Sequence, residues 1–282
     1  MKAFLGMGLL GSNFVKAMIK KGDQLQVWNR SSAKAKELES FGAKAFGDPA
    51  QAVKGAETIH LTLKDDDTVN AVLAMASPGF EPGVTIIDHT TTSLKGAIER
   101  TTLWKSRGYT YLHAPVFMGP QNALESTGIM IVSGDQALIS TFEDQLSKMT
   151  GRLINFGPQV GKAAGMKLIG NGFLLTLTAG ISETFSLSKA LGFAPADMMA
   201  LFDSWNPGAV LPARLKRMSD GNFKDTSWSL EMARKDAGLM INAAAEGKSA
   251  LSIIPGIAAQ MDQWIKKGHA TDDWTVIAKD NI

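Results

Sequence analysis

The sequence predicts an α/β domain with a doubly wound, mostly parallel sheet, followed by an all-helical domain that begins with a long helix. Short apolar runs alternate with helical patterns through the first half of the chain. A glycine-rich turn follows the first of these runs, and the strand pattern stops after residue 157. We therefore expect two domains, at residues 1–157 and 158–282.

The first strand, residues 2–5, leads into a G-x-G-x-x-G motif and then into a helical pattern at residues 12–21. The motif consists of Gly6, Met7, Gly8, Leu9, Leu10 and Gly11. In this context the first glycine permits a tight turn, the second lets a pyrophosphate approach the backbone, and the third lets helix and strand pack. The free N–H groups of the helix N-terminus then favour phosphate. A glycine-rich packing turn is the alternative, but the strand–turn–helix order favours a Rossmann dinucleotide site.

The second strand, residues 25–28, ends in residues that indicate which dinucleotide binds. An NAD site usually places Asp or Glu here to hold the ribose 2′-hydroxyl, whereas this chain has Asn29. Arg30 can pair with a 2′-phosphate, and Ser31 and Ser32 can donate hydrogen bonds to it. The serines could also simply cap the helix expected at 33–41. We expect NADP(H) to be preferred over NAD(H).

The remaining strands of the first domain should complete one open parallel sheet, at residues 57–63, 84–88, 109–114 and 129–133. Helices are expected from residue 65 to 75 and from 136 to 149. Because nucleotides bind at the carboxyl ends of such strands, the edge that carries Asn29 and residues 88–91 should form the site. We also assign Leu63, at the end of the third strand, to the cofactor.

The second domain should be helical at residues 162–191, 195–205, 228–245 and 252–267. Lys167 and Asn171 are four residues apart on the first of these helices, so their side chains share a face. Polar groups on a largely apolar helix are costly unless they face a cleft or a partner. Lys235 is a second candidate, although a single lysine on a helix is usually solvated.

Composition narrows the class of protein. A hydrophobic content of 45% and a charged content of 20% are typical of globular chains, and a net charge of +2 is too small to suggest nucleic-acid binding. The chain has no cysteine and its four histidines are scattered, so we expect no metal site and a cytoplasmic protein without a signal peptide. The apolar stretch at 168–181 should be too short to span a membrane. His89 and His113 could touch a ligand, but such residues are more often bystanders at a polar rim.

Five motifs, in order along the chain, resemble those of the β-hydroxyacid dehydrogenase family, which belongs to the 6-phosphogluconate dehydrogenase superfamily. They are the opening glycines, Asp88-His89-Thr90-Thr91, Ala114-Pro115-Val116, Gly161-x-x-x-Gly165-x-Lys167-x-x-x-Asn171, and Lys235-Asp236-Ala237-Gly238-Leu239. The resemblance covers essentially the whole chain. It implies hydride transfer between a nicotinamide and a small carbonyl or alcohol, of the semialdehyde or hydroxy-acid type.

The resemblance also implies roles for individual residues. Lys167 would be the general acid or base, and Asn171 would orient either the lysine or the substrate hydroxyl. Thr91 would contact the nicotinamide ribose, and Lys235 would hold the cofactor or the closed state. Relatives associate as dimers or tetramers, which implies a homo-oligomer.

One stretch departs from the family pattern. The family's substrate loop reads Pro-Val-Ser-Gly-Gly or Pro-Val-Ser-Gly-Ser and binds a carboxylate, whereas this chain has Val116, Phe117, Met118 and Gly119. A carboxylate that loses water without gaining donors is destabilised. Phe117 and Met118, with Trp205 and Trp228, could therefore line a pocket for an uncharged substrate. Alternatively, Phe117 and Met118 could merely pack between domains.

Two other functions fit parts of this pattern. An imine reductase or reductive aminase shares the two-domain plan and the use of NADPH, but it usually lacks the lysine found at Lys167. A non-catalytic NADP-binding module would be expected to lose Lys167, Asn171 and Lys235, all of which are present. The sequence therefore favours an NADPH-dependent oxidoreductase.

Overall fold

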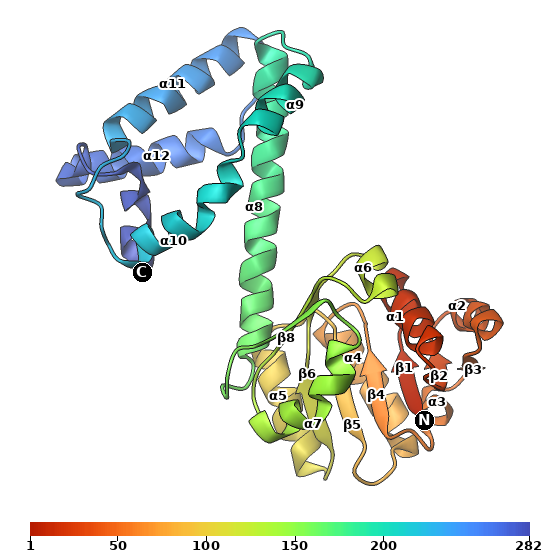
Figure 1. Cartoon of the computed structure of the whole chain (residues 1–282). Coiled ribbons are helices and arrows are strands. Elements are labelled where there is room, and N and C mark those ends of the chain that lie inside the picture. The colour runs from red at the N-terminus through yellow and green to blue at the C-terminus, as the bar shows by residue number, and fades with distance from the viewer. The chain divides into compact units, whose positions relative to one another are not determined.

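The computed structural model describes all residues, 1–282, as two compact units, Met1–Gly172 and Phe173–Ile282 (Figure 1). The division falls inside helix α8 (Lys162–Ala190), at residue 172 rather than at the expected residue 157. The first turns of α8 belong to the first unit because they are anchored there. Ala163 is fully buried, and its N–H donates to Ser133 Oγ at 2.8 Å.

A parallel sheet of six strands in the order β3-β2-β1-β4-β5-β6 forms the centre of the first unit. The strands are β1 (Lys2–Leu5), β2 (Leu25–Trp28), β3 (Lys44–Phe46), β4 (Thr58–Leu61), β5 (Thr85–Asp88) and β6 (Thr110–His113). Leu5 pairs with Trp28 on one side and with Leu61 on the other, so the carboxyl ends of these strands are aligned. The doubly wound fold is confirmed, and β3 is a strand that the sequence analysis missed.

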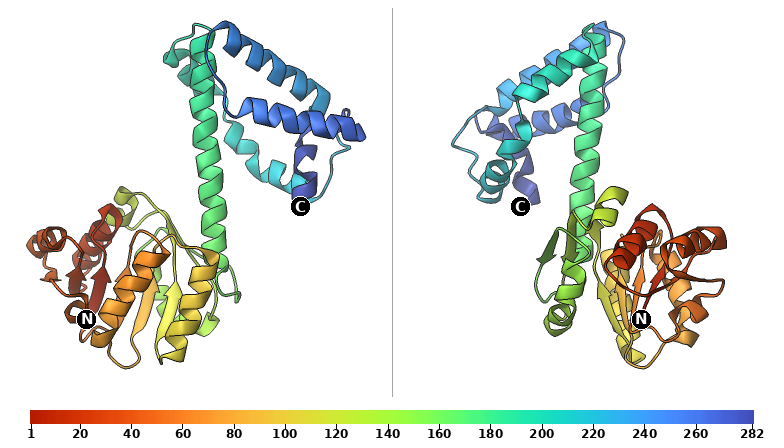
Figure 2. Two further views of the ribbon diagram at one scale, coloured as in Figure 1. Left: turned by 180° about the vertical axis from the view of Figure 1, so that it is seen from behind. Right: turned by 45° about the vertical axis from the view of Figure 1, so that its right-hand side comes forward.

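Helices cover both faces of this sheet (Figure 2). Phe4 of β1 packs in a cluster with residues of α1 (Leu9–Lys20), α2 (Ser32–Lys36) and α7 (Gln136–Ser147). Its neighbours Ala3 and Leu5 point to the other face, as strand alternation requires, and pack with α3 (Pro49–Val53), α4 (Asp66–Ala76) and α5 (Leu94–Ser106). Short 3₁₀ helices follow α2 at Glu37–Phe41 and α4 at Ser77–Gly79.

A second, three-stranded sheet corrects the sequence analysis. We expected residues 129–133 to extend the parallel sheet, but β8 (Ile129–Val132) instead lies between β7 (Val116–Phe117) and β9 (Arg152–Asn155). β7 is antiparallel to β8, and β9 is parallel to it. Helix α6 (Pro120–Glu125) connects β7 to β8 and packs against α1.

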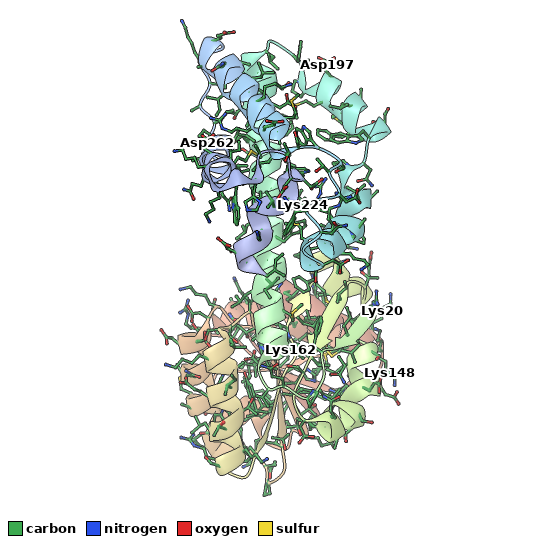
Figure 3. All side chains as sticks on the ribbon, turned by 90° about the vertical axis from the view of Figure 1, so that its left-hand side faces the viewer. Lys20, Lys148, Lys162, Asp197, Lys224 and Asp262 are labelled. Carbon is green, nitrogen blue, oxygen red and sulfur yellow. The ribbon has the colours of Figure 1, made fainter.

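The second unit is helical, as expected. Besides the remainder of α8 it contains α9 (Pro195–Ser204), α10 (Leu211–Ser219), α11 (Leu230–Glu246) and α12 (Ile254–Trp264), with a π-helix at Ile265–His269 and 3₁₀ helices at Pro207–Val210 and Trp274–Asn281. Its core gathers Leu230, Met261, Trp264 and Val276. Lys224, labelled in Figure 3, is tied to the buried Asp272 by an ion pair of 2.6 Å.

A buried carboxylate links two helices of this unit. Glu183 of α8 accepts hydrogen bonds from the N–H groups of Ser252, Ile253 and Ile254 and from the Ser252 hydroxyl, at 2.6–3.1 Å. Burial raises the pKa of this carboxyl, but the four hydrogen bonds outweigh burial and lower it overall. Glu183 thus satisfies the free donors at the start of α12.

Helix α8 is apolar along much of its length. Its 29 residues are long and apolar enough to cross a membrane by length and composition, so the expectation that this stretch is too short is wrong. Only 11% of the most apolar window is buried within the chain.

Candidate functional site

The glycine turn has the geometry that the sequence predicts. Gly6 has a φ of 100°, and a Cβ there would lie 2.2 Å from the Thr62 carbonyl oxygen. At Gly11 a Cβ would lie 2.0 Å from the Gly6 carbonyl oxygen, whereas at Gly8 nothing lies within 4 Å. The first and third glycines are therefore required by packing, and the second leaves open space for a ligand at the start of α1.

Asn29 braces this turn. Its Oδ1 accepts from the Met7 N–H at 2.9 Å, and its Nδ2 donates to the Ser31 carbonyl oxygen at 3.0 Å. The Arg30 guanidinium is exposed and forms no ion pair, and the Ser31 hydroxyl forms no capping bond to α2. Ser31 occupies the N-cap position of α2, as the alternative expected, but without a side-chain capping bond, so both side chains are free to bind an anion.

Nine of the predicted site residues line a cavity of about 340 Å³ at the carboxyl ends of the strands, whereas Gly6, Met7, Asn29, Arg30, Ser31, Phe117 and Asn171 do not line it. We call it the crevice. It is lined by Gly8, Leu9, Leu10, Gly11, Thr62, Leu63, Lys64, His89, Thr90, Thr91, Val116, Met118 and Lys167. These residues come from five separate stretches of the chain, so the fold converts scattered motifs into a single site.

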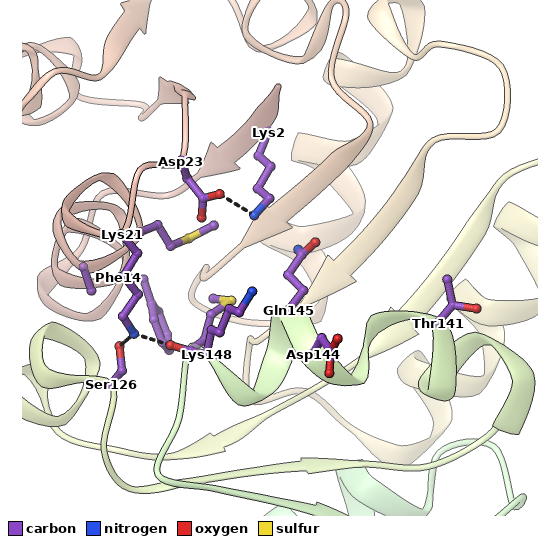
Figure 4. Close-up of a pocket in the computed structure, with 12 residues that line it drawn as sticks. Lys2, Phe14, Lys21, Asp23, Ser126, Thr141, Asp144, Gln145 and Lys148 are labelled. Carbon is purple, nitrogen blue, oxygen red and sulfur yellow. Dashed lines mark hydrogen bonds and ion pairs between the residues drawn. The ribbon is translucent and has the colours of Figure 1, made fainter.

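A second cavity, of about 320 Å³, lies where the strands begin (Figure 4). Its lining includes Lys2 and Asp23, which form an ion pair of 2.7 Å, and Lys21, which bonds the Ser126 hydroxyl and the Lys148 carbonyl oxygen. None of the predicted site residues line this cavity. We therefore place the candidate site in the crevice.

Lys167 is the chemically distinctive residue of the crevice. Its side chain is on α8, only 7% of the residue is exposed, and its Nζ donates to Asn171 Oδ1 at 2.9 Å. The Nζ also lies 4.2 Å from the centroid of the Phe117 ring. No carboxylate pairs with this ammonium, and burial lowers its pKa from the ordinary 10.5.

A buried polar network supports the crevice loop of residues 88–93. Asp88 accepts from the Thr90 N–H at 2.8 Å and from the Tyr111 hydroxyl at 2.6 Å. The Thr90 hydroxyl in turn accepts from the Leu63 N–H at 2.9 Å. Thr91 is thereby left exposed at the crevice, and its hydroxyl forms no bond within the chain.

Two buried histidines stack beneath the crevice. His89 Nδ1 must donate to the Ala114 carbonyl oxygen at 2.9 Å, so its Nε2 accepts from His60 Nδ1 at 3.0 Å. His60 Nε2 then accepts from the Gln145 amide at 2.8 Å. Burial lowers the pKa of His89 to about 4 and that of His60 well below its ordinary value, so both rings are neutral at pH 7. His89 and His113 are thus buried residues and not exposed rim residues, and His89 also lines the crevice.

Several predicted residues lie outside the crevice. The Gly119 N–H donates to Asn122 Oδ1 at 2.9 Å, at the start of α6. Trp205, Trp228 and Lys235 belong to the second unit. There Trp205 stacks on Phe202, Trp228 packs against Trp274, and Lys235 pairs with Asp236 at 2.9 Å. Their assignment to the site stays a prediction.

Sequence reasoning missed Thr62 and Lys64 as lining residues. The available signal was position, because each lies directly after a predicted strand or beside a residue already assigned. It also missed the contact between Phe117 and Lys167, for which spacing along the chain gives no signal.

Comparison with known proteins identifies the family. Residues 2–157 match the NAD binding domain of 6-phosphogluconate dehydrogenase. The chain therefore belongs to the family defined by the 6-phosphogluconate dehydrogenase NAD binding domain. An uncharacterised oxidoreductase of Shewanella frigidimarina is 26% identical to this family member, and the alignment covers 98% of this chain and 97% of the relative. The human cytokine-like nuclear factor N-PAC is 27% identical over 95% of the chain but over only 48% of its own length.

Solved structures share the fold of this family member. An imine reductase from Myxococcus stipitatus in complex with NADP⁺ superposes with a TM-score of 0.93, at 22% identity and over 99% of each chain. A reductive aminase from Aspergillus terreus in complex with NADPH4, cyclohexanone and allyl amine gives 0.89, at 20% identity over 100% of this chain and 99% of that one. The protein is an NAD(P)-dependent oxidoreductase of this two-domain type.

The histidine stack makes a testable contribution to stability. His89 has a pKa of about 4 when folded, below its ordinary 6.5, so the unfolded chain takes up a proton first as the pH falls. The free energy of unfolding should therefore be highest above pH 6.5. For this one group it should fall by about 2 kcal/mol between pH 7 and pH 5.

Urea denaturation at both pH values measures this change, and His89→Asn, which keeps a donor for Ala114, should show a shallower dependence. An equal fall in the variant would mean that His89 does not titrate on unfolding.

Proposed function

We propose that this protein is an NADPH-dependent reductase that transfers hydride to a small carbonyl compound, with Lys167 as the proton donor. The observation that carries the proposal is a buried ammonium without a carboxylate partner in the same crevice as the glycine turn. Burying a cation in this way is costly, and such costs are concentrated at functional sites.

The chain's residues fit the cofactor. The open space at Gly8 and the uncapped start of α1 suit a pyrophosphate, since the first N–H groups of the helix have no side-chain acceptor. Thr91 and Leu63 would lie against the nicotinamide half, and Arg30 and Ser31 would hold the 2′-phosphate. Lys235 would also bind the cofactor. When bound, NADPH would supply the hydride.

Lys167 would supply the proton. Negative charge grows on the carbonyl oxygen during reduction, and an ammonium within hydrogen-bond reach both stabilises that charge and transfers its proton. The lowered pKa makes the proton easier to give up near neutrality. Asn171 would aim the ammonium, because its Oδ1 already accepts one of the three N–H bonds.

A second candidate is reduction of an imine, supported by the close fold match to imine reductases and a reductive aminase. The retained Lys167 favours carbonyl reduction. NADPH oxidation with cyclohexanone, measured with and without allyl amine, distinguishes the two. Turnover that requires the amine would support imine reduction, and NADPH binding without turnover on any substrate would indicate a non-catalytic module.

We also propose that the protein acts in the cytoplasm as a homo-oligomer in which a second copy covers the apolar side chains of α8. Ile169, Phe173, Leu174 and Leu175 are each more than half exposed in the single chain. A patch of this kind on one helix usually marks an interface. Light scattering on the purified protein should give a mass of two or four times 30.1 kDa, and a monomeric mass would contradict this proposal.

Replacing Lys167 tests the proton donor. Lys167→Ala should lower the turnover number by about 10²- to 10⁴-fold, because the proton donor is lost, and should leave NADPH affinity nearly unchanged. Lys162→Ala removes the same charge from an exposed position five residues earlier on α8 and serves as the matched control (Figure 3). A Lys167→Ala variant with most of its turnover would remove this residue from the mechanism.

Replacing Arg30 tests the cofactor preference. Arg30→Ala should weaken NADPH binding about 10-fold and leave NADH binding unchanged, since only the 2′-phosphate contact is lost. Fluorescence titration of both cofactors measures the two affinities, and Arg152→Ala, exposed elsewhere on the same unit, controls for net charge. If the variant binds NADPH and NADH more weakly by the same factor, Arg30 does not contact the 2′-phosphate.

A further inference from the structure

The stretch from Pro115 to Pro120 lines the crevice with Val116 and Met118, and the ring of Phe117 between them contacts the crevice residue Lys167. Phe117 is the second residue of β7, and its backbone is fixed opposite Ile129 of β8. Met118, the next residue, packs on Gly128, where a Cβ would lie 2.9 Å from Met118 Cγ. The pairing with β8 therefore fixes the backbone of Phe117, and the contact with Gly128 fixes the side chain of the next residue.

The Phe117 ring sits on α8 at a glycine. A Cβ at Gly170 would lie 2.4 Å from Phe117 Cζ and 2.6 Å from Cε1, closer than any side chain can approach. The edge of the ring thus fills the space that Gly170 leaves on the helix. Gly170 is three residues after Lys167, so the two positions lie on the same side of α8.

The face of the same ring meets the Lys167 ammonium. The Nζ lies 4.2 Å from the ring centroid, and Asn171 Oδ1 accepts from the same nitrogen at 2.9 Å. The ammonium is thereby held between an amide oxygen and an aromatic face, and it lines the crevice with Leu63 and Thr91. A cation over an aromatic ring is stabilised without any counter-charge.

This stretch offers little to a carboxylate. None of its side chains carries a hydroxyl, amide or positive charge, and the Gly119 N–H already donates to Asn122 Oδ1. A carboxylate placed against Phe117 and Met118 would lose water without gaining donors from this stretch.

We propose that Phe117 is a positioning residue: its ring packs against Gly170 and holds the Lys167 ammonium toward the crevice. The same residue selects uncharged carbonyl or imine substrates over substrates that carry a carboxylate. The claim about substrates rests on the reductase function proposed above. The claim about position does not, because it concerns only residues of the folded chain.

The position of Lys167 is tested without turnover. In protein labelled with ¹³C at lysine Cε, the NMR titration of Lys167, assigned with Lys167→Ala, reports its pKa directly. Phe117→Leu removes the aromatic face and should move the titration to lower pH, since the ring favours the charged form. Gly170→Ala should do the same by displacing the ring. Gly172→Ala, where nothing lies within 4 Å of the new Cβ, is the matched control and should have no effect. If Phe117→Leu and Gly170→Ala both leave the pKa of Lys167 unchanged, the positioning role is overturned.

The substrate claim is tested with two substrates of nearly identical shape, succinic semialdehyde and its methyl ester. The wild type should prefer the ester by about 10-fold or more in kcat/KM, and Phe117→Ser should narrow or reverse that ratio. Preference of the wild type for the acid, or an unchanged ratio in Phe117→Ser, overturns the claim about specificity. Absence of NADPH oxidation with both substrates and with the cyclohexanone reactions would instead count against the reductase function, and the NMR result would still decide the positioning role.

Discussion

The site depends on one buried charge, the ammonium of Lys167, which the chain holds without a carboxylate. Burial lowers the pKa of this ammonium, and the amide oxygen and aromatic face beside it do not offset burial as an anion would, so its proton is easier to release. An anionic partner would have raised the pKa and occupied the donors. The surroundings of Lys167 therefore suit a proton donor better than a structural ion pair.

The rest of the first unit keeps this charge in place. Gly161, with a φ of 82°, and the bond from the Ala163 N–H to Ser133 Oγ fix where α8 begins. Across the crevice, the close contacts at Gly6 and Gly11 fix the turn from β1 into α1. Because the ammonium and the turn are anchored in one packed unit, the distance between Lys167 and the start of α1 is set by the fold.

Local patterns predicted much of this arrangement. The strand–turn–helix context predicted the tight turn at Gly6 and the close packing at Gly11, and helical spacing placed Lys167 and Asn171 on one face, where they are hydrogen-bonded. The prediction failed where the structure depends on pairing between distant segments. β7 has two residues and β9 is the mixed run Arg152–Asn155, so neither shows an apolar pattern, and without them β8 was assigned to the wrong sheet. Likewise, nothing in the spacing of Phe117, Lys167 and Gly170 indicates that they meet.

The pH dependence of turnover in the reducing direction tests the central claim, that Lys167 donates the proton, most directly. Reduction needs the protonated ammonium, so the turnover number of the wild type should fall with rising pH through a single pKa below the ordinary lysine value of 10.5. A turnover number that stays constant to pH 10.5, in protein shown to remain folded there, would contradict the account.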